Sequence, residues 1–283
     1  MQNQQESAVT PILVHVVGIH LPGHTETRQV AVMFSGRVAV VTGSAQGLGK
    51  VFSGVLLERG SKVCISDVNQ SELEKTYKEF KSKYAENVIS QQCDVTDTEQ
   101  LKEVFRKTKY TYGQLDLVVN NAGIVNEKNW QQCIDVNLNG TIRGTMLGME
   151  YMRKDKGGKG GLILNMSSLA GIFPVNYTPA YAASKHGVIG YTRSWSMHPD
   201  VVNNGVRLVC LCPAFVDTDM IKMDDDSKFV GTDLAQQVIE KFGIMSTDHI
   251  IPVFVNAIED EENNGSVISI TLKGANKVPL PMP

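Results

Sequence analysis

Tyr181 and Lys185 are the residues of this sequence whose types and spacing best suit chemistry. They stand four positions apart, so on a helix the phenol and the ammonium share one face. A free phenol titrates near ~10, and a cation held close to it favours the phenolate and lowers its pKa. We therefore predict that Lys185 lowers the pKa of Tyr181 and that Tyr181 exchanges a proton with an alcohol.

A strand that ends in two hydroxyls precedes this pair. The run 162–168 begins with apolar residues, as a short buried strand does, and ends in Ser167 and Ser168. A hydroxyl in that place can orient the oxygen of a substrate. A Tyr-x-x-x-Lys pair alone is most often an ordinary piece of helix, so the catalytic interpretation depends on the elements around it.

Composition limits the classes of function. With 283 residues, 42% of them hydrophobic and 20% charged, the chain has the composition of a soluble globular protein. A net charge of -3 without a basic cluster argues against a nucleic-acid partner. The five cysteines are scattered and odd in number, which fits neither a zinc site nor a disulfide framework. We expect no metal, reduced thiols and a cytoplasmic location.

The first 34 residues differ from the rest of the chain. Residues 12–19 are apolar only briefly and are interrupted by His15 and Gly18, which suits neither a signal peptide nor a membrane span. We expect a poorly ordered extension at 1–34, one catalytic domain at 35–273, and a tail at 274–283. No other stretch reaches the length of a membrane span.

A strand, a glycine-rich turn and a helix follow one another from residue 37. The β-branched run 37–42 predicts a strand buried on both faces, and an amphipathic helix is expected at 50–59. Between them, residues 43–49 have the spacing G-x-x-x-G-x-G. Such a turn lets the backbone approach a diphosphate and points a helix N-terminus at it. A plain tight turn is the alternative, but this context favours a dinucleotide.

The next predicted strand, 62–67, ends in a carboxylate. Asp67 stands 24 positions after Gly43, near the ~20 expected for an acid that binds the adenosine ribose. Its charge would repel a 2′-phosphate, and Val68 offers no cation to bind one. NAD is therefore predicted over NADP. The alternative is that Asp67 caps the helix that begins near Gln70.

Helices and strands continue to alternate along the chain. This pattern predicts a single Rossmann-like α/β fold, a doubly wound parallel sheet of about seven strands with helices on both faces. The remaining strands are expected at 88–93, 115–119, 162–168, 206–212 and 265–272. The remaining helices are expected at 70–84, 97–112, 130–153, 180–197, 236–242 and 250–259. The polar run 222–233 is expected to be a mobile segment over the site.

These motifs together resemble the short-chain dehydrogenase/reductase family, over residues 36–272. The matching segments are 42–49, 120–123, Asn137, Ser168, and Tyr181 with Lys185. The resemblance implies that Tyr181 is the general acid/base and that Lys185 also contacts the nicotinamide ribose. It further implies that Ser168 holds the substrate oxygen and that Asn137 supports a water-linked proton relay.

The resemblance also implies an NAD site. Asp67 and Asp94 would bind the adenosine half, Asn121 and its neighbours would line the nicotinamide side, and Thr218 would reach the carboxamide. The expected cofactor-binding residues are Gly43, Gln46, Gly47, Leu48, Gly49, Asp67, Val68, Cys93, Asp94, Val95, Asn121, Ala122, Gly123, Tyr181, Lys185, Pro213, Phe215, Val216 and Thr218. The expected substrate contacts are Ser168, Thr178 and Tyr181.

Within the family, segments 126–130, 165–171 and 183–187 are similar to those of the NAD-dependent 15-hydroxyprostaglandin dehydrogenases. This implies oxidation of a 15-hydroxy eicosanoid to the 15-oxo compound, in lipid and prostaglandin metabolism. Two positions depart from that group: Ala214 replaces a glycine, and Thr178 replaces a substrate-binding Gln. The alternatives are a general alcohol or retinoid/steroid dehydrogenase, and a binding protein on the same fold that has lost turnover.

The family resemblance also implies a homodimer built on the helices expected at 130–153 and 180–197. Both helices carry apolar residues on more than one face, including Met146 in the first and Trp195 in the second. Residues left over after the sheet is covered suit a two-fold interface.

Overall fold

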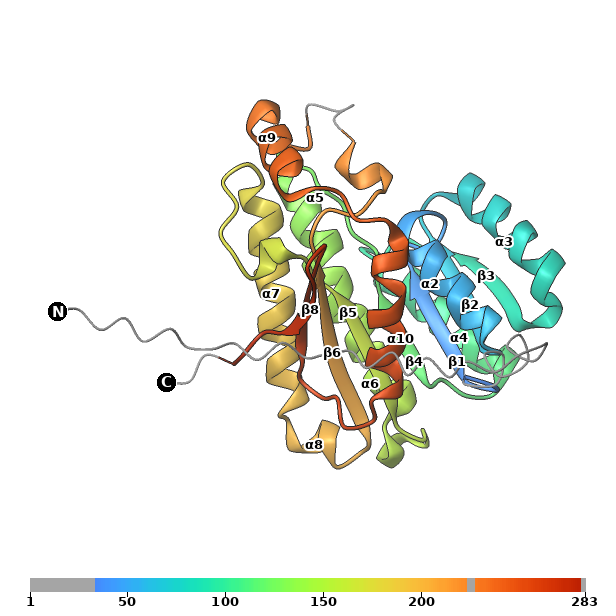
Figure 1. The fold of residues 1–283 in the computed structure, drawn as a ribbon. Helices are drawn as coiled ribbons and strands as arrows, with labels where there is room; N and C mark the ends of the chain where they lie inside the picture. Colours follow the sequence, from blue (N-terminus) through green and yellow to red (C-terminus); the bar gives the residue numbers. More distant parts are fainter. Residues whose placement is uncertain (1–33, 223–226, 281–283) are drawn as a thin grey trace, which may run out of the picture.

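In the computed structural model of the chain, residues 34–222 and 227–280 are described, and within them one sheet of eight strands forms the centre (Figure 1). The sheet order is β3-β2-β1-β4-β5-β6-β7-β8. The strands are β1 (Val38–Thr42), β2 (Lys62–Asp67), β3 (Val88–Gln92), β4 (Leu117–Asn120), β5 (Gly161–Met166), β6 (Val206–Pro213), β7 (Val267–Thr271) and β8 (Gly274–Lys277). The first seven pair in parallel, and the strand order reverses between β1 and β4. Open α/β sheets bind ligands at such a switch point.

Helices cover both faces of the sheet, as the alternating pattern predicts. One face carries α2 (Gly47–Glu58), α3 (Gln70–Tyr84) and α10 (Ile251–Glu259), and the other carries α4 (Thr98–Tyr112), α6 (Gly140–Met152) and α7 (Pro179–Ser196). Successive residues of β1 point to opposite faces, so Val41 packs with the α2 core and Val40 with the α4 core. The doubly wound fold is therefore confirmed.

Three further α-helices lie in the connecting segments of the described chain. They are α5 (Trp130–Ile134), α8 (Pro199–Val202) and α9 (Thr232–Phe242). α9 begins at Thr232, four residues earlier than the predicted 236. Gly231, with a φ of 83°, is the N-cap residue, and the first turn of the helix is polar, so the apolar pattern does not show it. No helix within 34–222 and 227–280 combines the length and the hydropathy needed to cross a bilayer.

The tail predicted at 274–283 contains a strand, β8, that the sequence analysis did not anticipate. β8 pairs antiparallel with β7 after a tight turn at 272–273, and Gly274, the first residue of β8, has a φ of 117°. Beyond it, the Arg193 guanidinium on α7 donates to the carbonyls of Val278 at 2.8 Å and Pro279 at 3.0 Å. β8 is an exposed edge strand, so its sequence lacks the apolar alternation that reveals inner strands.

The helix predicted at 130–153 is helical from Trp130 to Met152, but it is not a regular α-helix throughout. α5 and α6 are joined by a π-helical turn at Asp135–Asn139, whose wider winding accommodates one extra residue. Asn137 lies in the middle of this turn and is fully buried.

Both ends of the predicted domain extend slightly. Phe34, which was assigned to the extension, is 1% exposed and packs in the core, with its N–H donating to Arg59 O at 3.1 Å. The rest of the predicted extension, at 1–33, and the segment 223–226 of the polar run lie outside the described residues. The expectations for those segments stay predictions.

Candidate active site

Tyr181 and Lys185 lie on one face of α7, as their spacing predicts. Tyr181 belongs to the first turn of the helix, and the Lys185 ammonium lies 5.5 Å from the centre of its ring. Lys185 is 3% exposed, and its Nζ donates to Met166 O at 2.9 Å. The ammonium is therefore fixed to the end of β5, beside the tyrosine.

Burial, and not the neighbouring cation, dominates the titration of this pair. It raises the pKa of Tyr181 to about 12, and a hydrogen bond with Ser168 offsets only part of that rise. Burial also lowers the pKa of Lys185 to about 8. The shift of Tyr181 is opposite to the one predicted, because the charged form of each group loses solvent in the site. At neutral pH the phenol holds its proton, which suits an acid, and it becomes a base only once that proton has left.

Ser168 joins the ends of two central strands next to the tyrosine. It follows β5, its Oγ accepts from Ala170 N at 3.1 Å, and the same hydroxyl donates to Pro213 O at 3.5 Å at the end of β6. Pro213 is thereby placed at the catalytic edge of the sheet. A substrate oxygen at this point would meet the hydroxyls of both Ser168 and Tyr181.

Asn137 is held by four polar contacts. Its Oδ1 accepts from Ile124 N at 2.8 Å, and its Nδ2 lies within hydrogen-bond distance of Ile124 O at 2.9 Å, Ser184 Oγ at 3.1 Å and Cys133 Sγ at 3.3 Å. The Ser184 hydroxyl in turn donates to Tyr181 O at 2.6 Å. The π-helical turn thus ties Asn137 to the catalytic helix and to the loop after β4.

The glycine-rich turn is packed too tightly for side chains. Gly43 and Gly47 have positive φ values of 63° and 56°. A Cβ on Gly43 would lie 2.7 Å from Ala122 Cα, and one on Gly49 would lie 2.1 Å from Gly43 O. Thr218 faces this turn, since its Cγ2 would lie 3.6 Å from a Cβ on Gly47.

The N-terminus of α2 is open to an anion. Its capping position, Gln46, is exposed and makes no side-chain cap bond, and the first turn carries no acidic residue. Leu48, behind it, packs against the core. The free N–H groups and the dipole of a twelve-residue helix therefore face the glycine cradle. This arrangement fits the diphosphate of a dinucleotide.

The residues expected around the adenosine lie side by side at the ends of β2 and β3. Asp67 Oδ2 accepts from Ala45 N at 3.0 Å, and Cys93 N donates to Asp67 O at 3.0 Å. The next residue, Val68, is 60% exposed, so its side chain does not cover the carboxylate of Asp67. The side chain of Asn69 caps α3, so the alternative role of Asp67 as the helix cap was wrong.

The second half of this region follows β3. Asp94 Oδ1 accepts from the N–H of Thr96 at 2.9 Å and from its hydroxyl at 2.8 Å, which stiffens the loop. Val95 is 7% exposed and packs in the core beside α6. Burial raises the pKa of the Cys93 thiol to about 12, so that thiol stays neutral.

Asn121 fixes the glycine turn to the end of β4. Its Nδ2 donates to Thr42 O at 3.0 Å and to Gly43 O at 2.9 Å. Ala122 N donates to the Thr42 hydroxyl at 3.2 Å. Beyond it, a Cβ on Gly123 would lie 3.2 Å from Asn137 Oδ1 and 3.4 Å from Lys185 Nζ. The segment 121–123 therefore runs between the diphosphate turn and the catalytic residues.

The segment after β6 completes this side of the site. Phe215 O accepts from Met245 N at 2.8 Å, and Val216 forms an isolated parallel bridge with Met245. Ala214, which replaces a family glycine, has a negative φ, because Ala85 is the one non-glycine residue with a positive φ in the described part of the chain. The substitution therefore costs no backbone strain.

Glu127 is a functional candidate that the sequence reasoning missed. Its two carboxylate oxygens accept from the backbone N–H groups of Ala180 at 3.0 Å and Tyr181 at 2.9 Å. α7 has no acidic residue in its first turn, and Thr178 makes no side-chain cap bond. The unpaired N–H groups at the start of α7 are the signal that could have indicated a carboxylate from elsewhere in the chain.

A small apolar cluster lies beside the catalytic residues. Tyr177, Phe229 and Ala235 form its buried part, and Val125, Val175, Phe215 and Val238 pack against it. Thr178, the expected substrate contact, directly follows Tyr177 in the chain and is 3% exposed. The site thus combines polar catalytic groups with apolar surroundings.

Comparison with known proteins agrees with this geometry. Residues 37–228 match the model of the short chain dehydrogenase family. The chain is 42% identical over 243 residues to the 15-hydroxyprostaglandin dehydrogenase [NAD(+)] of Mus musculus, covering 84% of this chain and 90% of that protein. For the enzyme of the same name from Homo sapiens the identity is 41% over 249 residues, covering 84% and 91%.

A solved structure has a similar fold. The crystal structure of levodione reductase superposes with a TM-score of 0.74 at 25% identity, covering 84% of this chain and 97% of that one. The chain therefore belongs to the short-chain dehydrogenase family, and it is an oxidoreductase that acts on CH–OH groups.

Proposed function

We propose that this protein oxidises a secondary hydroxyl on an apolar substrate with NAD, converting a 15-hydroxy eicosanoid to its 15-oxo form. The observation that carries the proposal is the meeting of Ser168, Tyr181 and Lys185 beside an apolar cluster. The identity of 42% to a prostaglandin dehydrogenase from mouse supports the substrate class.

In this proposal the residues of the chain orient the alcohol and move its proton. Ser168 and Tyr181 hold the substrate oxygen, and the hydroxyl proton passes to the Tyr181 oxygen as the C–O bond becomes C=O. NAD, when bound, supplies the nicotinamide C4 that accepts the hydride from the carbinol carbon. Lys185, fixed on Met166 O, stabilises the phenolate that precedes proton uptake. Asn137 supports the water-linked path by which the proton leaves.

The preference for NAD rests on Asp67. Its carboxylate lies beside the glycine turn, through its bond with Ala45 N, where it would accept from the ribose hydroxyls and repel a 2′-phosphate. Val68 is exposed and uncharged, so it supplies no counter-ion for that phosphate. The Asp67→Ala, Val68→Arg double variant should narrow or invert the preference for NAD over NADP.

We also propose that the protein is cytoplasmic and forms a homodimer. All five cysteines are buried and free of disulfides, which suits a reducing compartment. The dimer would form across α6 and α7, where Met146 is 47% exposed.

One feature favours a second candidate, a general alcohol or retinoid/steroid dehydrogenase. Thr178 stands where the prostaglandin enzymes have a Gln. The Thr side chain is shorter and carries a hydroxyl in place of a carboxamide, so it would make a different contact with a substrate. A catalytically lapsed binding protein is the third candidate, and the intact set of Asn137, Ser168, Tyr181 and Lys185 argues against it.

The test is the fluorescence of NADH after mixing the protein with NAD or NADP and a panel of secondary alcohols. The panel holds a 15-hydroxy eicosanoid, a retinol and a 3-hydroxysteroid, with the 15-oxo eicosanoid as the control that lacks the hydroxyl. We expect NADH with the 15-hydroxy eicosanoid and far slower NADPH formation. Turnover of only the retinol or the steroid would support the second candidate, and no turnover of any alcohol would support the third.

A further inference from the structure

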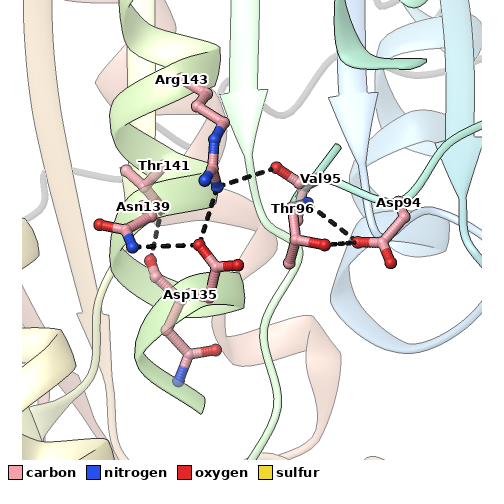
Figure 2. Close-up of polar contacts among 8 residues, drawn as sticks. Asp94, Val95, Thr96, Asp135, Asn139, Thr141 and Arg143 are labelled. Atoms are coloured by element: carbon pink, nitrogen blue, oxygen red, sulfur yellow. Dashed lines mark hydrogen bonds and ion pairs between the residues drawn. The ribbon is translucent and has the colours of Figure 1, made fainter. Parts of the chain in front are cut away.

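Arg143, on α6, connects two parts of the site that are far apart in sequence (Figure 2). Its Nη1 donates to Asp135 Oδ1 at 3.0 Å and to Val95 O at 3.4 Å. Asp135 begins the π-helical turn that carries Asn137, and Val95 follows Asp94 in the loop after β3. One guanidinium thus contacts both the catalytic turn and the loop expected to bind adenosine.

On the catalytic side, Asp135 braces the π-helical turn. Asn139 Nδ2 donates to the same Asp135 Oδ1 at 3.0 Å, and Gly140 N donates to Asp135 O. The Thr141 hydroxyl donates to Asn137 O at 2.8 Å. A π-helical turn is intrinsically less favourable than an α-helical one, so side-chain bonds across it help to keep Asn137 in place.

On the adenosine side, the loop is stiff and is seated on α6. Asp94 accepts two hydrogen bonds from Thr96 (Figure 2). A Cβ on Gly140 would lie 2.8 Å from Val95 Cγ2, so the absence of a side chain there lets Val95 pack against the helix. A displacement of the loop would therefore be transmitted to α6 by packing and through Arg143.

We propose that Arg143 is a positioning residue that couples the adenosine loop to the π-helical turn, so that binding of the adenosine half favours the catalytic placement of Asn137. This inference rests on the proposed cofactor site. The pair is partly exposed, at 26% for Arg143 and 38% for Asp135, so solvent weakens it. The coupling is accordingly modest, about threefold to fivefold in affinity.

A double-mutant cycle measures this coupling with ADP-ribose, a fragment that carries the adenosine half without the nicotinamide. The proteins are the wild type, Asp135→Asn, Arg143→Met, and the double variant, each titrated by calorimetry. Asp135 reaches the Val95 loop through Arg143. We therefore expect Asp135→Asn to weaken ADP-ribose binding about threefold in the wild-type background and to have no effect once Arg143 is Met.

A control variant and a kinetic readout separate coupling from a loss of folding. Arg106→Met is the matched control, because Arg106 forms an exposed ion pair with Glu103 on α4 and should leave ADP-ribose binding unchanged. Arg143→Met should lower kcat, through Asn137, while leaving the KM for the alcohol unchanged.

The outcomes are distinct. The coupling would be overturned if Asp135→Asn left the affinity for ADP-ribose unchanged. It would also be overturned if Asp135→Asn weakened that affinity equally in the wild type and in Arg143→Met. Either result would leave the proposed function standing. No binding of ADP-ribose by the wild type would contradict the proposed function itself.

Discussion

At the scale of single residues, the position of Tyr181 depends on a carboxylate more than 50 residues earlier in the chain. Glu127 accepts from the N–H groups of Ala180 and Tyr181, two of the donors that the first turn of a helix leaves unpaired. The backbone N–H groups of Glu127 and Lys128 both donate to Ser227 O, at 2.9 Å and 3.3 Å. Glu127 therefore joins the start of the catalytic helix to the segment before α9.

Glu127→Gln should separate positioning from binding. The carboxamide keeps one acceptor but turns an NH₂ group toward a backbone N–H, so one charge-assisted bond is lost. We expect kcat to fall about tenfold, which corresponds to roughly 1.4 kcal/mol, with the KM for NAD unchanged. Steady-state kinetics measure both, and Glu150→Gln, an exposed change on α6, is the control. Wild-type kcat in Glu127→Gln would assign Glu127 to stability alone.

The sequence predicts some of these residues and not others, for physical reasons. Tyr181 and Lys185 could be paired because a helix places positions four apart on one face. Glu127 could not be found, because its partners are backbone groups of a distant helix. The direction of the Tyr181 pKa shift also depends on burial, which only the packed structure supplies.

At the scale of elements, inner strands and long helices were predictable, and the irregular elements were not. β1 and β2 are buried runs of β-branched and apolar residues, which predict strands directly. The π-helical turn at Asp135–Asn139 was not predicted, because the sequence over 130–153 indicates a helix without showing where the spacing of its backbone hydrogen bonds changes. β8 could not be predicted, because an exposed edge strand of four residues has no apolar signature.

The proposed dimer is a property of α6 and α7. Met146 on α6 is 47% exposed, whereas Trp195 on α7 is partly buried against His198 of its own chain, with ring centres 5.1 Å apart. Met146 is therefore the better probe of an interface. We expect light scattering at micromolar concentration to give a dimer mass for the wild type and a monomer mass for Met146→Glu, since a buried unpaired charge is unfavourable.

The control for this experiment is Tyr110→Glu, which places the same charge on α4, at a residue that is 91% exposed. It should leave the dimer intact. A monomer mass for the wild type, with or without NAD, would contradict the assembly.

At the scale of the whole molecule, the sheet brings the separate motifs together. The glycine turn follows β1, Asp67 ends β2, Asn121 follows β4, and Ser168 follows β5. Parallel strands place all of these carboxyl ends at one edge of the sheet, so the alternating pattern predicted that the motifs would meet. The contacts between them, such as Asn121 with the glycine turn, depend on the loops and needed the structure.

The most direct measurement is the rate of hydride transfer to NAD by Tyr181→Phe, with Tyr191→Phe, ten positions further along α7, as the control. Tyr181→Phe removes only the hydroxyl that exchanges the proton. We therefore expect turnover below about a hundredth of the wild-type value, with the Kd of NAD nearly unchanged and Tyr191→Phe close to wild type. Turnover of Tyr181→Phe above about a hundredth of the wild-type value would contradict the assignment of Tyr181 as the acid/base.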